Sequence, residues 1–150
     1  MRKAFTMIEL VFVIVVIGIL AGIAIPRFAA TRGDAEISSA KATIAAIRSS
    51  LANERQLRVL RGDFTAISSI DNDGIASTAV STFSADKDGN SKSVLETTIP
   101  VCSSDDDKGC WVDSLHYRMP AGIAGVVTFT LANGQFNCDV ADANCRKLTQ

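Results

Sequence analysis

MRKAFTMIELVFVIVVIGILAGIAIP, residues 1–26, places two basic residues in front of a long apolar run. The run extends from Phe5 to Ile25, and Glu9 is its only charged residue. A helix needs about 20 mostly apolar residues to cross a bilayer, so this segment is long enough to do so. The sequence therefore predicts a membrane-associated helix, and it raises the question of why that helix keeps one acid.

Three interpretations of this segment compete, and they differ in where the chain is cut. The run is a cleaved secretory signal with a small-x-small site at residues 22–24, a plain single-pass anchor, or a segment retained after a short leader is removed. An acid inside an apolar span is disfavoured and usually functional, which favours the third interpretation. Cleavage between Ala4 and Phe5 would create a positively charged amine about 6 Å along a helix from Glu9.

A neighbouring copy of the chain, shifted along the same axis, could present its own terminal amine to Glu9. The acid would then set the register between copies, as a buried polar group does in a coiled coil. This hypothesis gives the acid a purpose that a simple signal peptide or anchor lacks.

The residues KAFTMIEL (3–10) resemble the processing motif of type IV pilins and type II secretion pseudopilins. The resemblance implies that a prepilin peptidase cuts between Ala4 and Phe5 and methylates the new amine of Phe5. It also implies that Glu9 pairs with a subunit amine during filament assembly. Ala4 stands where the family usually has glycine, and Pro26 falls where the family commonly has a helix-kinking proline.

The resemblance implies three segments: a leader (1–4), a transmembrane and polymerisation helix (5–26) and a periplasmic globular domain (27–150). The subunit would cross the bacterial inner membrane once and enter an extracellular or periplasmic filament. Its implied partners are other copies, the prepilin peptidase, an assembly ATPase and a platform protein. The sequence slightly favours a secretion pseudopilus over a pilus, and the alternative function is a monomeric, membrane-anchored or secreted binding protein.

Apolar residues after the first segment change to a helical period. They recur at steps of three and four, as on one face of an amphipathic helix: Ile37, Ala40, Ile44, Ile47 and Leu51. The helix is expected to run to about Leu60 and to end at Arg61-Gly62-Asp63. Such a rod is longer than a globular domain of this size, so its apolar half must protrude.

The C-terminal third predicts an antiparallel sheet with strands at 94–101, 111–118, 123–131 and 135–140, and a short helix is expected near 75–83. Asn133-Gly134 predicts a two-residue hairpin turn. That turn places three pairs on one face, against the helix: Leu131 with Phe136, Phe129 with Cys138, and Val127 with Val140. The predicted fold is α+β, with a long N-terminal helix packed on a C-terminal antiparallel sheet.

The four cysteines, Cys102, Cys110, Cys138 and Cys145, all lie in the last third of the chain. Their even number, beside a membrane-targeting segment, favours disulfides in an oxidising compartment. A zinc site is disfavoured, because the C-x7-C and C-x6-C spacings lack the tight pairs that zinc sites use. Three connectivities are possible, and the two sequential pairs are favoured.

Two aspartate-rich stretches, Asp71–Gly74 and Asp86–Gly89, contain the D-x-D-G core of a calcium loop. An EF-hand needs glutamate at its twelfth position, where these stretches have Val80 and Leu95. Asp-Gly turn chemistry explains them more simply, so no metal site is predicted.

Catalysis and nucleic-acid binding find no support in the sequence. His116, the single histidine, is expected as an ordinary strand residue, and no serine lies in a nucleophile-elbow pattern. No phosphate-binding glycine loop is present, and the net charge of −1 gives no basic surface for nucleic acid. We therefore expect neither an enzyme nor a bound cofactor.

Overall fold

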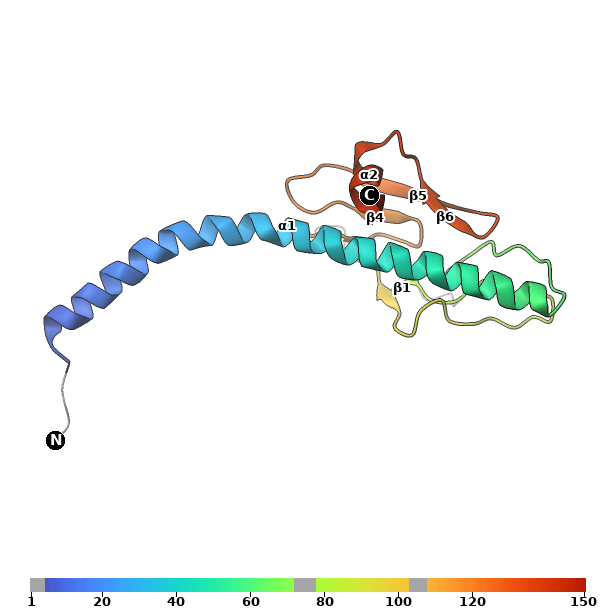
Figure 1. Cartoon of the computed structure of the whole chain (residues 1–150), viewed down its shortest axis with the longest axis horizontal. Coiled ribbons are helices and arrows are strands. Elements are labelled where there is room, and N and C mark those ends of the chain that lie inside the picture. The colour runs from blue at the N-terminus through green and yellow to red at the C-terminus, as the bar shows by residue number, and fades with distance from the viewer. Residues whose placement is uncertain (1–4, 72–77, 103–107) are drawn as a thin grey trace.

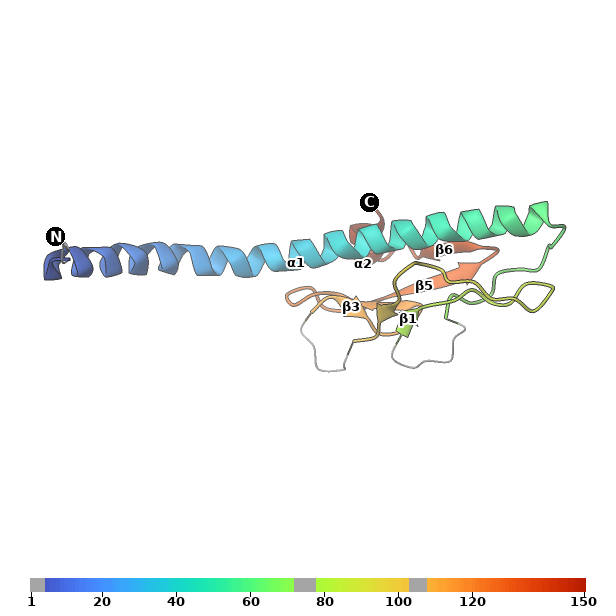
Figure 2. The same ribbon diagram turned by 90° about the horizontal axis from the view of Figure 1, so that it is seen from below.

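A computed structural model describes residues 5–71, 78–102 and 108–150 of the chain. One helix, α1 (Met7–Leu60), extends along the whole length of the molecule (Figure 1). The two sheets and a short C-terminal helix, α2 (Ala143–Thr149), lie along its second half, and its first half extends beyond them (Figure 2). This arrangement confirms the predicted α+β fold with a protruding apolar helix.

The helix α1 begins and ends where the sequence provides capping residues. Thr6 is the N-cap, and at the other end the amides of Gly62 and Asp63 donate to the carbonyls of Val59 and Arg58. Gly62 has φ +71°, the left-handed conformation that completes this type of helix end. The 54 residues between the caps span about 81 Å, and the helix passes position 26 without a break.

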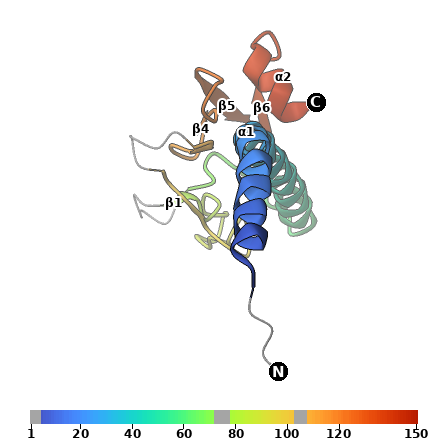
Figure 3. The same cartoon turned by 90° about the vertical axis from the view of Figure 1, so that its left-hand side faces the viewer.

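Within the described residues, six strands form two antiparallel sheets. The two-stranded sheet pairs β1 (Thr78–Val80) with β2 (Ile99–Pro100). The four-stranded sheet has the order β3-β4-β5-β6, with β3 at Cys110–Trp111, β4 at His116–Arg118, β5 at Val126–Ala132 and β6 at Gln135–Cys138. Viewed from the N-terminal end, β1 and β4 lie on the same side of α1 (Figure 3).

The hairpin β5–β6 confirms the predicted turn. Asn133 and Gly134 both have positive φ, +52° and +73°, as a type I′ turn requires. Phe129 faces Cys138 and Leu131 faces Phe136, as predicted.

The third predicted pair is wrong, because β6 ends at Cys138. Val140 is 64% exposed, and Val127 pairs instead with Tyr117 of β4. Beyond the strand, the carboxylate of Asp139 accepts the amide of Ala141, which turns the chain away from the sheet.

Several predicted strand limits are also wrong. Only residues 99–100 of 94–101 form a strand, and they pair with β1 rather than with the main sheet. The predicted strand 111–118 is interrupted by a turn in which Asp113 accepts the amides of Leu115 and His116. The strand expected from 123 starts at Val126. Of the helix expected near 75–83, residues 75–77 lie outside the described residues and residues 78–80 form β1.

The core lies between the second half of α1 and the sheets. Ala40, Ile44, Ile47 and Leu51 are all at most 2% exposed, and Ile37 packs partly buried against the same core, which confirms the predicted helix face. They pack in one hydrophobic cluster with the aromatic side chains of the large sheet: Trp111, Tyr117, Phe129 and Phe136. The rings of Phe129 and Phe136 are stacked with centroids 4.6 Å apart.

Candidate functional site

The first half of α1 exposes its apolar side chains on every side. Residues Met7–Ala24, which we call the apolar half, have a mean hydropathy of 2.8, and none of this segment is buried within the chain. Ile8 and Phe12 are 79% and 69% exposed. A soluble monomer rarely leaves so long an apolar surface uncovered, so the apolar half requires a lipid or protein environment.

Glu9 lies in the first turn of the apolar half and has a local partner. Its Oε2 atom accepts the backbone amide of Thr6 at 3.1 Å and the hydroxyl of Thr6 at 3.0 Å. In return, the Thr6 hydroxyl accepts the backbone amide of Glu9 at 3.3 Å. This reciprocal arrangement is a capping box, which satisfies amides that the first helical turn leaves without partners.

The sequence carries a signal for this contact that the interpretation of Glu9 as a register device did not use. Thr6 and Glu9 follow the T-x-x-E pattern of a capping box directly ahead of an apolar run. Glu9 therefore has a role inside one subunit, and a role between subunits would have to exchange or share these hydrogen bonds.

The proposed cleavage point lies at the edge of the described chain. Phe5 precedes the helix and is 84% exposed, so the structure buries neither its side chain nor the start of α1. Ala4, on the other side of the expected cut, lies outside the described residues. Cleavage and methylation at Phe5 accordingly stay predictions.

Both cysteine pairs are disulfide-bonded in the sequential pattern that the sequence favours. Cys102 is joined to Cys110, and Cys138 to Cys145. The second bond ties β6 to α2, whose N-cap Asp142 accepts the amide of Asn144 at 2.9 Å. The helix α2 was not expected from the sequence, although an aspartate at this position is a usual start signal for a helix.

Contacts at Gly109 hold the end of the Cys102–Cys110 loop against α1. The amide of Gly109 donates to Oε2 of Glu36 at 2.7 Å, and Arg32 pairs with the other oxygen at 3.2 Å. A side chain at position 109 would lie 2.5 Å from the Tyr117 hydroxyl, so only glycine fits there. Burial, with a smaller effect of Glu36, raises the pKa of Tyr117 to about 12.

In the last turns of α1, the buried side of the helix carries charged residues instead of apolar ones. Arg58 is 1% exposed, and its Nε atom lies 3.0 Å from Oε1 of Glu54, while Lys92 approaches the other oxygen at 3.6 Å. The guanidinium also donates to the carbonyl of Ser84. These contacts attach the connection between the helix and the sheets to the far end of α1.

The carboxylate of Asp63, directly after α1, is surrounded by donors. Hydrogen bonds from the hydroxyl and amide of Thr65, and from the amide of Lys87, lower the pKa of Asp63 to about 2. The neighbouring stretch at 86–89 forms a turn, because the Asp86 carboxylate accepts the amides of Asp88 and Asn90.

Turn formation therefore explains the second aspartate-rich stretch. Residues 72–74 of the first stretch lie outside the described residues. Over 5–71, 78–102 and 108–150, no group of three or more acids, histidines or cysteines is placed to hold a metal ion. Among the same residues, His116 contacts the Asp113 carboxylate at 2.7 Å within a turn.

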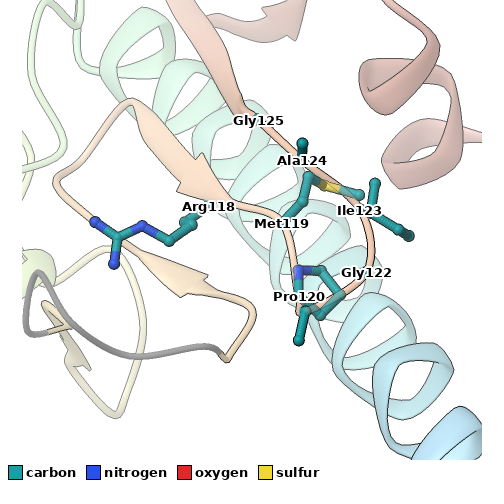
Figure 4. A pocket seen from close by; sticks show the side chains of 8 residues that line it. Arg118, Met119, Pro120, Gly122, Ile123, Ala124 and Gly125 are labelled. Atoms are coloured by element: carbon teal, nitrogen blue, oxygen red, sulfur yellow. The ribbon is translucent and has the colours of Figure 1, made fainter.

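A hollow with both polar and apolar lining lies at the end of the domain nearest the apolar half. Its volume is about 470 Å³, and the turn between β4 and β5 lines it. Met119 and Pro120 are buried, Ile123 is half-buried, and Arg118 points away from the turn (Figure 4). We call this feature the proximal hollow.

Comparison with known proteins finds similarity in the N-terminal segment. Residues 1–25 match the family model described as the prokaryotic N-terminal methylation motif. The type IV narrow pilus major component PilA5 of Thermus thermophilus is 52% identical over 50 residues, which cover 33% of this chain and 43% of that relative. The chain thus matches less than half the length of this curated relative, and no solved structure matches significantly.

Proposed function

Since the chain carries the N-terminal methylation motif of the type IV pilin family, we propose that it is a structural subunit of a type IV pilus or a related pseudopilus. The observation that carries this proposal is the uncovered apolar half. It is 18 residues long with none of them buried, while the domain behind it has a complete core of its own. A subunit with two environments, first the membrane and then other copies, accounts for both features.

The proposed sequence of events begins at the bacterial inner membrane. The apolar half spans the bilayer once, with the domain (residues 27–150) in the periplasm, where the disulfides are stable. A prepilin peptidase removes residues 1–4 and methylates the amine of Phe5. Copies then pack through their apolar halves into a homo-oligomeric filament, with an assembly ATPase and a platform protein as partners.

The relative's name favours a pilus over a secretion pseudopilus. PilA5 is described as a major component of a narrow type IV pilus, and its 52% identity covers 50 residues. The slight preference for secretion drawn from the sequence has no comparable support. We therefore propose a pilus-type filament first, with the pseudopilus as the second form of the same role.

Glu9 is proposed to act through its charge as well as through its cap. Its carboxylate contacts Thr6 within one subunit, and at the proposed assembly step it would also meet the positive N-terminal amine of a neighbour. An apolar surrounding strengthens the attraction between such charges, so losing the negative charge would weaken the correct register strongly.

Two substitutions separate these roles. Glu9→Gln keeps a side chain that completes a capping box but removes the charge, whereas Glu9→Ala removes both. We expect both variants to insert in the membrane and both to lose filaments, as measured by electron microscopy of sheared cells and by membrane fractionation. Thr6→Ala, which removes the cap but keeps the charge, should retain more assembly than either.

The opposite pattern would reject the charge role. If Glu9→Gln assembles normally and Thr6→Ala does not, helix capping alone explains the acid. If all three variants and the native chain remain monomeric with the apolar half intact, the chain is an anchored binding protein instead of a filament subunit. Mass spectrometry of the mature N-terminus checks processing, because the proposal requires a start at Phe5.

A further inference from the structure

The end of α1 farthest from the apolar half carries an uncovered apolar surface. Val59, Leu60 and Phe64, which we call the distal patch, are 44%, 82% and 75% exposed. Val59 and Leu60 line a groove of about 350 Å³ with the stems of Arg55 and Gln56. Single exposed apolar residues are ordinary, but a cluster beside a groove is typical of a contact site.

The membrane that holds the apolar half does not reach the distal patch. About 54 Å of helix separates Ala24 from Leu60, whereas the headgroup region extends only several ångströms beyond the bilayer core. Within one subunit the proximal hollow is also out of reach, because its Pro120 lies beside Gly33 near the start of the domain. About 40 Å of helix lies between Gly33 and Leu60.

The two features therefore lie at opposite ends of one domain. The distal patch exposes large apolar side chains at the end of α1, and the proximal hollow of about 470 Å³ is large enough for an aromatic side chain. A surface patch that fits a hollow elsewhere on the same molecule makes a head-to-tail contact, which repeats along a filament instead of closing into a dimer.

We propose that the distal patch of one copy docks in the proximal hollow of the next copy along the same filament. This inference rests on the proposed function, which gives all copies the same polarity. Leu60 and Phe64 would contact the exposed turn at Ala121 and Gly122 and the half-buried Ile123 of the copy farther from the membrane. The domains would then be joined end to end, in addition to the packing of their apolar halves.

The small size of the distal patch identifies a second copy as its occupant. A stable interface between free proteins buries about 1,200 Å² or more, which three side chains do not provide. Inside a filament, however, the apolar halves hold neighbouring domains at a high effective concentration, so a small contact suffices. A separate soluble partner would lack that assistance and would bind too weakly.

Photo-cross-linking of assembled, full-length chains tests this contact. Phe64 is replaced by p-benzoylphenylalanine, which keeps an aromatic side chain, and cross-linked peptides are identified by mass spectrometry. We expect cross-links from position 64 to residues 118–125 of a second copy. The matched control has the same probe at Val140, which is 64% exposed and lies outside the distal patch, and should not label residues 118–125 of a second copy.

A substitution gives an independent measure. The double variant Leu60→Asp, Phe64→Asp should keep the domain's melting temperature, because both side chains are exposed, and should lower filament yield about tenfold or more. Val140→Asp should change neither quantity. Filaments of native yield from the double variant, or cross-links from position 64 only to a different protein or a different surface, would overturn the inference.

The outcomes also separate this inference from the proposed function. If native chains form filaments that Glu9→Gln abolishes while position 64 fails to label the proximal hollow, only the head-to-tail contact is rejected. If native chains form no filament under any condition, the proposed function falls and the docking contact with it.

Discussion

The two halves of α1 share one unbroken helix but have opposite relations to solvent. In the apolar half, Leu10 and Ile14 are 56% and 57% exposed, whereas Ile47 and Leu51 in the second half are completely buried. In the second half, an apolar stripe packs against the sheets and the other sides are polar. In the apolar half, apolar residues occupy every side of the helix. The first half therefore contributes little to the fold and is available for contacts outside the chain.

Removing the apolar half should have the largest effect on solubility and little effect on the folded domain. A chain that begins at residue 28 should be soluble and should melt within a few degrees of the full-length protein in detergent. The core explains this expectation, because its first fully buried member is Ala40. Aqueous fractionation and thermal melting followed by circular dichroism are the measurements. An unfolded or insoluble truncated chain would show that the apolar half supports the domain.

Matched leucine substitutions sharpen the comparison within the intact chain. Leu51→Ala should lower the free energy of unfolding by about 2–5 kcal/mol, because it leaves a cavity in the core. Leu10→Ala makes the same chemical change on an exposed surface, and should alter domain stability by less than about 0.5 kcal/mol. Denaturant titration of both variants in detergent measures this, and equal losses would contradict the division into two halves.

The smallest expected effect is on stability at low pH, and it depends on Asp63, which directly follows the second half of α1. The pKa of Asp63 is about 2 in the folded chain, below its ordinary 3.8, because Thr65 and Lys87 donate hydrogen bonds to the ionised carboxylate. The resulting stability is present above pH 4 and is lost as the pH falls through about 2. Asp63→Asn should therefore flatten the decline in melting temperature over this range.

A neighbouring carboxylate provides the control for the acid experiment. Asp88→Asn changes an exposed residue in the adjacent turn and should leave the slope of melting temperature against pH close to that of the native chain. If the two variants give the same slope between pH 4 and 2, the hydrogen bonds around Asp63 do not set the acid response.

Local signals predicted the long helix and the β5–β6 hairpin well. The period of the apolar residues gave the buried face, Gly62 gave the helix end, and Asn133-Gly134 gave the turn type and two cross-strand pairs. Each of these depends on residues close together in the chain. Thr6 belongs to the same class, because its capping pattern was present in the sequence although it was not used.

Features that depend on distant residues were not predictable in the same way. β1 and β2 are short and stabilised by each other, with about 20 residues between them. The helix α2 is seven residues long, too short to be stable alone, and it depends on the buried side chain of Leu148 and on the disulfide at Cys145. The distal patch and the proximal hollow lie more than 50 residues apart in sequence, so only the fold shows that they occupy opposite ends.

The continuity of α1 has a mechanical consequence. No joint separates the apolar half from the part that is fixed to the sheets, since the helix runs from Met7 to Leu60 as one piece. In the proposed filament, a pull or twist on the domain would therefore be transmitted along the backbone of α1 to the packed apolar halves. Stretching the chain under tension would first require the breaking of consecutive backbone hydrogen bonds of α1. Each copy would therefore behave as a stiff element and not as a domain on a flexible linker.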